Sequence, residues 1–213
     1  LRSKFIFKTP KEYSLVIFDE VSVKDLKICL SKINFFTLQT RFAYVNKIYF
    51  SYRILKQIFK NLFIGNLYTV YLVSLIELIK PKVVITSIDN SLKFSDIAKI
   101  LEKKINFIAI QNATRGDFLD WKYLYDIKKT KHNFLKKFYI PNFYCFGDYE
   151  REFYKQLNIN VKNIYPIGNL RWANFLNHIK KENHSLEKYN SDICLISEYI
   201  GDSYLHAAGA FDK

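Results

Sequence analysis

The sequence predicts an α/β domain built on a parallel β-sheet. Short β-branched runs alternate with stretches of helical periodicity, and polar turns follow the apolar runs. The clearest example lies between residues 81 and 117, where strands at 83–86 and 107–110 are joined by a helix with a serine cap. A strand, helix and strand of this length form a right-handed βαβ unit. Continuous β-branched runs suit strands that are buried on both faces.

The same alternation continues on both sides of this unit. Expected strands lie at 13–19, 34–39, 143–146, 161–166 and 192–197, and expected helices at 21–30, 44–60, 67–79, 149–157 and from 172 onward. The helix at 44–60 has basic residues on one side. It fits an ordinary surface helix packed on a sheet, and it also fits a helix that lies on anionic lipid.

This alternation predicts one complete domain and the beginning of another. We expect a first domain at 1–171, an interdomain connection at 172–190 and the start of a truncated second domain at 191–213. The chain contains no methionine, and the strand at 192–197 is followed by no convincing helix. We therefore expect the sequence to be an internal fragment of a longer protein.

Composition limits the classes of function. The chain has 213 residues, of which 49% are hydrophobic and 25% charged, and a net charge of +13. This balance is globular, and the charge is expected to be a lysine-rich surface, because no nucleic-acid-binding motif accompanies it. The three cysteines have no CxxC spacing and the four histidines no metal-ligand spacing. We expect buried thiols, no metal and no nucleic-acid partner.

Polar residues follow the predicted strands. Asp19 ends the first strand, Asp89 and Asn90 follow 83–86, and the loop after 107–110 contains Gln111, Asn112, Arg115 and Asp117. The carboxyl ends of parallel strands meet at one edge of a sheet, where α/β proteins bind ligands. Structural alternatives stand beside this interpretation: a helix cap for Asp19 and for Asp89, and a salt bridge to Arg115 for Asp117.

Five segments resemble a known family when they are taken in order. They are VIFDE at 16–20, ITSIDN at 85–90, IQNATRGDF at 110–118, FYCFGDYEREFYK at 143–155 and YPIGNLR at 165–171. This set resembles bacterial surface-carbohydrate (surface polysaccharide) biosynthesis proteins, which are similar to GT-B glycosyltransferases and, more distantly, to CDP-glycerol glycerophosphotransferases. The first loop lacks the histidine of those transferases and no proline precedes Arg171, so their catalytic histidine is not carried over.

The resemblance implies two Rossmann-like domains, with an acceptor site on the first and a nucleotide-sugar site mainly on the second. The expected function is transfer of a sugar from a nucleotide-activated donor to a glycan or lipid-linked acceptor, in capsule or O-antigen assembly. The enzyme would need no cofactor besides the donor as co-substrate. It is expected in the cytoplasm, peripheral to the inner membrane, with an anionic membrane surface as a further partner. The alternative is a non-catalytic glycan- or lipid-carrier-binding protein of the same pathway.

Such a transfer needs a base on the acceptor and positive charge near the leaving diphosphate. Asp89 and Asp117 are the candidate bases, and Arg115 and Arg171 the candidate phosphate ligands. Arg171 fits equally well as an anchor for the domain connection. The remaining candidate substrate-binding residues are Asp19, Asn90, Gln111, Asn112, Asn169, Trp121, whose ring could stack on a sugar, and Glu198 from the second domain.

Overall fold

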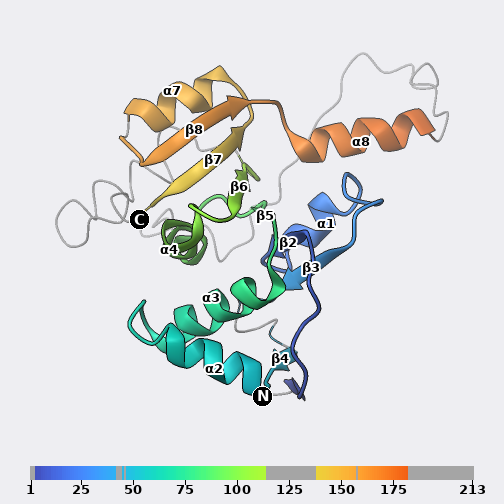
Figure 1. Cartoon of the computed structure of the whole chain (residues 1–213). Helices are drawn as coiled ribbons and strands as arrows, with labels where there is room; N and C mark the ends of the chain where they lie inside the picture. Colours follow the sequence, from blue (N-terminus) through green and yellow to red (C-terminus); the bar gives the residue numbers. More distant parts are fainter. Residues whose placement is uncertain (1–2, 42–44, 46, 114–137, 157, 182–213) are drawn as a thin grey trace, which may run out of the picture. The chain divides into compact units, whose positions relative to one another are not determined.

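A six-stranded parallel β-sheet forms the centre of the protein (Figure 1). The computed structural model describes residues 3–41, 45, 47–113, 138–156 and 158–181. The order of the strands is β3-β2-β5-β6-β7-β8, and each neighbouring pair is parallel. Their bounds are β2 (Leu15–Phe18), β3 (Phe35–Leu38), β5 (Val83–Thr86), β6 (Asn106–Ile110), β7 (Ile140–Cys145) and β8 (Val161–Pro166). The predicted α/β class is confirmed, and the sheet is compatible with a Rossmann-like fold.

The sheet changes its direction of winding at β2. The chain passes from β2 to β3 on one side, crosses to β5 on the other side, and continues outward through β6, β7 and β8. A reversal of this kind leaves the carboxyl ends of the two strands beside it, here β2 and β5, without connections that cross between them. Open α/β sheets bind ligands at such a point.

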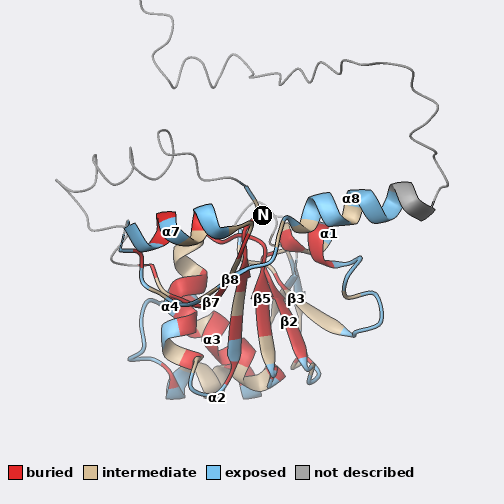
Figure 2. Cartoon of the chain, turned by 90° about the horizontal axis from the view of Figure 1, so that it is seen from above, coloured by how far each residue is buried: buried red, intermediate tan, exposed pale blue. Residues whose placement is uncertain are grey.

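One face of the sheet carries the larger hydrophobic core. Alternation along β2 directs Val16 and Phe18 to this face and Leu15 and Ile17 to the other. The helices that supply this core are α3 (Leu67–Ile79), α4 (Leu92–Leu101) and α7 (Asp148–Gln156). Outside α3 packs α2 (Tyr52–Lys60), which buries Ile54. β2 and β5 run through the buried centre (Figure 2).

The other face carries a smaller core and a polar ladder. Helix α1 (Ser22–Leu26) contributes Leu26, and α8 (Leu170–Lys181) contributes the partly buried Leu170. Nearer the amino ends of the strands, the Asn142 side-chain amide donates to Asn106 Oδ1 at 2.7 Å, and that of Asn163 donates to Asn142 Oδ1 at 3.1 Å. This face is therefore polar at one end of β6–β8 and apolar at the other.

Helix ends follow local sequence signals. Asn66 caps α3, with Oδ1 accepting from the Thr69 backbone N–H at 2.9 Å, and Ser91 caps α4 by accepting from Phe94 N at 3.2 Å. Lys80 ends α3 in the left-handed region at φ 54°, directly before Pro81. Proline cannot continue the helix, so the chain turns into β5.

The predicted helix at 44–60 is wrong in its first part. Residues Lys47–Tyr49 form a strand, β4, which pairs in parallel with β1 (Lys4–Ile6) in a separate two-stranded sheet. The helix begins only at Tyr52, after the Ser51 cap. Pairing with a distant segment has overridden the helical spacing of the apolar residues.

The chain divides into a compact unit, Leu1–Asn177, and a second unit, His178–Lys213. The boundary lies inside α8, within the predicted connection at 172–190, and the predicted second domain lies outside the described residues. Of the two cysteines that are described, Cys145 is buried as expected, whereas Cys29 is exposed. The helix predicted at 21–30 ends at Leu26, before Cys29.

Candidate functional site

The turns that contain Asp89 and Gln111 lie at the same edge of the sheet. Asp89 follows β5 and Gln111 follows β6, and these strands pair in parallel with Thr86 opposite Ala109. Two of the predicted polar turns therefore converge at the carboxyl edge, as far as the described residues extend.

Asp89 is buried at this edge, with 2% of its surface exposed. The Tyr154 hydroxyl, from α7, donates to Asp89 Oδ2 at 3.1 Å, and the Tyr154 ring packs on Phe143 with centroids 4.5 Å apart. The predicted cap role of Asp89 is wrong, because Ser91 caps α4. In this conformation Asp89 joins the turn after β5 to α7, and its carboxylate does not face solvent.

Gln111 bridges the ends of two strands. Its Oε1 accepts from Phe146 N at 2.9 Å and its Nε2 donates to the Ala113 carbonyl at 2.9 Å, with 2% of the residue exposed. Asn90 is exposed and Asn112 is partly exposed. These two side chains, rather than Gln111, present polar groups to solvent at this edge.

Asp19 holds the turn between β2 and α1. Its backbone takes φ 79°, and its Oδ1 accepts from Val21 N at 3.0 Å. Its Oδ2 accepts from Thr40 Oγ1 at 3.1 Å and from Arg41 Nε at 2.8 Å, and the side chain is 6% exposed. Asp19 is not the cap of α1, because Val21 occupies the N-cap position without a side-chain cap bond; its contacts instead join the turn after β2 to Thr40 and Arg41.

Arg171 forms a bidentate ion pair with Asp25. Its Nε donates to Asp25 Oδ1 at 3.0 Å and its Nη2 to Oδ2 at 2.9 Å, and this hydrogen bonding raises the pKa of Arg171. The Asn174 side chain donates to the Asp25 carbonyl at 2.9 Å. The guanidinium group therefore anchors the start of α8 to α1, as the structural alternative for Arg171 proposed. Its two hydrogen-bonding nitrogens already bind a carboxylate.

Polar residues that were not predicted continue this network to the winding reversal. Ser87 Oγ donates to Asp25 Oδ2 at 3.2 Å, and the Ser87 N–H donates to Ser22 Oγ at 2.9 Å. The Ser22 and Thr86 hydroxyls lie 3.3 Å apart. The available signal was the Thr86-Ser87 pair at the carboxyl end of a strand, together with a helix that starts with a serine.

The remaining predicted residues are separate from this network or outside the described chain. Gly168 takes φ 96°, and Asn169 then starts α8, with Oδ1 accepting from Trp172 N at 3.1 Å. Arg115, Asp117, Trp121 and Glu198 lie outside the described residues.

A large cavity lies between β3, β4 and α3, and its lining extends to Glu20 and Gln39, just past the carboxyl ends of β2 and β3. Its volume is about 700 Å³, which is the size of a small-molecule site. The lining is mainly apolar and aromatic, with a few polar side chains, and includes Phe35, Phe36, Leu38, Tyr49, Tyr68, Tyr71, Leu72 and Leu75.

Three tyrosines line this cavity, together with the charged residues Glu20 and Lys47. Burial raises the pKa of Tyr49, Tyr68 and Tyr71, so their hydroxyls stay protonated. Tyr71 donates to the Tyr49 carbonyl at 3.1 Å and Tyr68 donates to the Thr40 carbonyl at 2.8 Å. With these hydroxyls directed to the backbone, the rings are available to an apolar ligand.

Two further properties hold for the part of the chain that the structure describes. It contains no cluster of three or more His, Cys, Asp or Glu side chains suited to a metal ion. It also contains no helix with the length and apolar character needed to span a bilayer.

Comparisons of the chain with protein-family models, with curated proteins and with solved structures found no match.

Proposed function

We propose that this chain is a glycosyltransferase-like domain of surface polysaccharide biosynthesis, which binds the glycan acceptor and takes part in transfer from a nucleotide-activated sugar. The observation that supports it best is the convergence of the turns after β5 and β6 at the carboxyl edge of a parallel sheet. Ligands of open α/β sheets bind at this edge. The ordered resemblance to surface-carbohydrate biosynthesis proteins supplies the substrate class and the GT-B-like two-domain arrangement.

The chemistry assigns a role to each candidate. The acceptor hydroxyl oxygen attacks the anomeric carbon while the bond from that carbon to the diphosphate oxygen breaks, and the diphosphate leaves with the electron pair. A carboxylate takes the hydroxyl proton, and we assign this role to Asp89 or Asp117. Asp89 can act only after the Asp89–Tyr154 contact opens, because its carboxylate is buried against that hydroxyl. Asp117 and Arg115 complete the proposed site from the loop after β6, with Arg115 near the leaving diphosphate.

The remaining substrate contacts are proposed for four further side chains, of which Trp121 and Glu198 lie outside the described residues. Asn90 and Asn112 would bind acceptor hydroxyls, Trp121 would stack on a sugar ring, and Glu198 would approach from the donor-side domain. Arg171, Gln111, Asp19 and Asn169 are better explained as residues that hold the edge in shape, because each already makes the intramolecular hydrogen bonds described above.

Separate substitutions of the two acids test this function. Transfer from a panel of UDP- and GDP-linked sugars, and binding of oligosaccharide acceptors, are measured for Asp117→Asn and Asp89→Asn. We expect a loss of transfer of at least about a hundredfold for whichever acid is the base, with acceptor binding unchanged. Asp96→Asn, at an exposed position of α4, is the matched control. A chain that neither transfers sugar nor binds any acceptor contradicts the proposal, and full transfer in both variants contradicts the assigned base.

The cavity favours a second candidate, a non-catalytic protein that binds a lipid carrier. A mainly apolar cavity of about 700 Å³ suits a prenyl or acyl chain, and Lys47 in its lining could meet the phosphate of a lipid carrier. Titration with a soluble prenyl phosphate tests it. Thr37→Trp, which places a large ring in the cavity lining, should abolish binding, whereas Asp89→Asn should not affect it. Binding that Thr37→Trp leaves unchanged would remove this candidate.

A further inference from the structure

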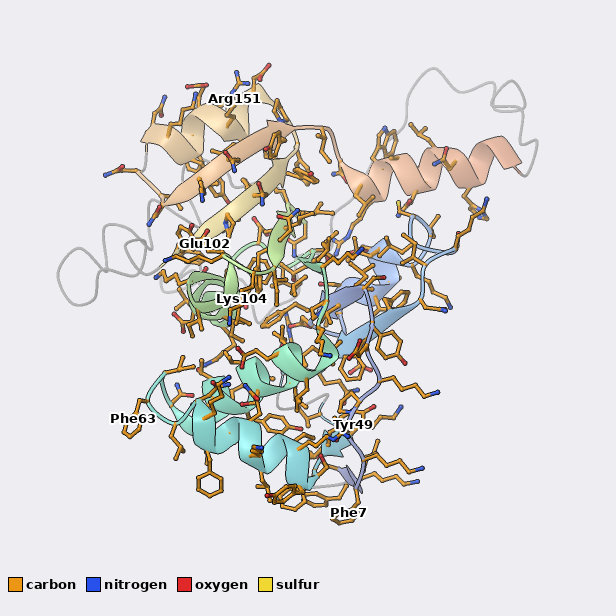
Figure 3. The ribbon with its side chains drawn as sticks, viewed as in Figure 1. Phe7, Tyr49, Phe63, Glu102, Lys104 and Arg151 are labelled. Carbon is orange, nitrogen blue, oxygen red and sulfur yellow. The ribbon has the colours of Figure 1, made fainter. Side chains whose placement is uncertain are left out.

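The turn between α2 and α3 exposes a continuous run of apolar side chains. Leu62, Phe63, Ile64 and Leu67 are all exposed, and Phe63 is 101% exposed. Figure 3 shows Phe63 directed away from the ribbon at the tip of this turn. Contiguous apolar patches are uncommon on the free surface of a monomer and mark an interaction site.

The outer face of α2 continues this surface. Tyr52, Lys56, Phe59 and Lys60 are spaced for one side of a helix, and all four are exposed, whereas Ile54 is buried on the opposite side. Tyr52 is 80% exposed and Phe59 69%. Aromatic and basic residues therefore alternate on a face that packs on nothing described in this chain.

The segment beside the start of α2 adds further aromatic rings. Phe7 and Phe50 are exposed and make an edge-to-face contact with centroids 6.2 Å apart, and Phe5 lies 6.4 Å from Phe7. The Thr9 and Ser51 hydroxyls, 2.8 Å apart, join this segment to the cap of α2. Phe7 and Phe63 lie toward the same end of the described unit, with α2 between them (Figure 3).

The charge of this region has a single sign. Between Asp25 and Glu77 the sequence contains no acidic residue, and its basic residues are Lys27, Lys32, Arg41, Lys47, Arg53, Lys56 and Lys60. A surface that combines exposed aromatic rings with lysines complements an anionic lipid headgroup layer, because the rings enter the interface and the ammonium groups meet the headgroups.

We propose that the α2 face and the α2–α3 turn form a docking surface for an anionic lipid bilayer. Tyr52, Phe59 and Phe63 insert at the boundary between headgroups and acyl chains, and Lys56 and Lys60 bind anionic headgroups. The surface holds the chain on the membrane without a transmembrane segment. Tyr68, which follows the same turn, also lines the cavity. The proposal does not depend on sugar transfer.

Sedimentation of the full chain with lipid vesicles tests the docking surface. We expect binding to phosphatidylglycerol-containing vesicles, weaker binding to pure phosphatidylcholine, and a decrease as NaCl rises from about 0.1 M to about 1 M. Phe59→Ser with Phe63→Ser should lower partitioning by at least about tenfold, because two rings no longer leave water. Lys56→Glu with Lys60→Glu should lower it by at least about tenfold on anionic vesicles only.

Matched variants separate this surface from general effects. Tyr149→Ala removes an exposed aromatic ring from α7, and Lys103→Glu reverses an exposed charge after α4; both should bind vesicles as the unchanged chain does. Phe63→Trp should add fluorescence that shifts to the blue with anionic vesicles and is quenched by brominated lipids. Two results would overturn the proposal. One is that the chain does not bind vesicles. This result includes the case in which the chain is a dimer that Phe63→Ser converts to a monomer, because the exposed surface would then bind a second copy of the chain. The other is an equal loss of binding in the control variants.

Discussion

The carboxyl edge of the sheet and the α2 end of the molecule differ in which side chains are buried and which are exposed. At the edge, Asp19, Asp25, Gln111 and Arg171 form hydrogen bonds to other parts of the chain. At the α2 end, Phe59 and Phe63 are exposed, and α2 is amphipathic with its basic and aromatic side outward. Polarity alone is therefore a poor guide to recognition in this protein.

The difference has a physical reason. A buried polar group needs a partner, so polar residues at the ends of packed strands are recruited first for internal hydrogen bonds. An exposed ring has no such requirement and gains free energy only when it leaves water. At this edge Asn90 is exposed and Asn112 is partly exposed, so a ligand can reach these two residues more readily than the buried ones.

The largest expected effect on unfolding free energy comes from a phenylalanine-to-alanine substitution, made once in the core and once on the exposed α2–α3 turn. Phe94 is 1% exposed and packs edge-to-face on Phe18 and Phe107, with centroids 5.4 and 5.6 Å away. Phe94→Ala should lower the free energy of unfolding by about 3–5 kcal/mol, because it removes apolar contacts and leaves a cavity. Phe63→Ala should change it by less than about 0.5 kcal/mol. Urea unfolding followed by circular dichroism measures both, and equal losses would mean that Phe63 is buried in solution.

The hydrogen-bond network at the edge gives the next effect. Asp25→Ala removes the partner of Arg171 and Ser87, and we expect a loss of about 2 kcal/mol in unfolding free energy. The value is moderate because the Arg171 side chain is 54% exposed and partly screened by water. Glu152→Ala, which removes an exposed carboxylate paired with Lys155, should leave unfolding unchanged. A loss no greater than that of the Glu152 variant would show that the network adds no stability.

Much of the fold follows from local sequence signals. Strands at 83–86 and 161–166 and the helix at 67–79 have the predicted bounds, because each is delimited by a cap, a proline or a polar turn and has the periodicity of its class. β4 was predicted as helix because its pairing partner, β1, lies far away in the sequence: Lys47 is opposite Lys4. No local pattern carries that information.

The site was predictable to a lesser extent for the same reason. Positions after strands identified Asp89 and Gln111 as residues of the carboxyl edge, but their orientation depends on Tyr154 and Phe146, which come from other elements. Asp25 and Arg171 are separated by 146 positions in the sequence, so their pairing is not visible in it. The apolar run at 62–64 has the composition of a core segment, yet in the structure it is exposed at the turn between α2 and α3.

Removing a helix cap should have a smaller effect on unfolding free energy, and it can be compared between the carboxyl edge and the exposed turn. Ser91→Ala at the edge and Asn66→Ala beside the exposed turn should each cost about 1 kcal/mol, because each removes the acceptor for a backbone N–H in the first turn of a helix. Equal costs would show that the exposed turn is held in a defined shape by its own cap. A negligible effect of Asn66→Ala, measured by the same urea titration, would indicate that this turn frays.

The smallest effect concerns a polar pair at the amino edge of the sheet. The Tyr139 hydroxyl donates to the Glu102 carboxylate, and burial together with this bond raises the pKa of Tyr139 to about 12. The folded state therefore favours the neutral phenol, so the stabilisation is complete below the unfolded pKa of about 10 and is lost as pH rises through about 12. Tyr139→Phe should be less stable than the unchanged chain by under about 1 kcal/mol near pH 8, with the difference closing toward pH 12. Urea titrations across this range measure it. A constant difference would mean that the Tyr139 ring, and not its hydroxyl, makes the contribution, and it would leave Glu102 without a role in holding β7 to the end of α4.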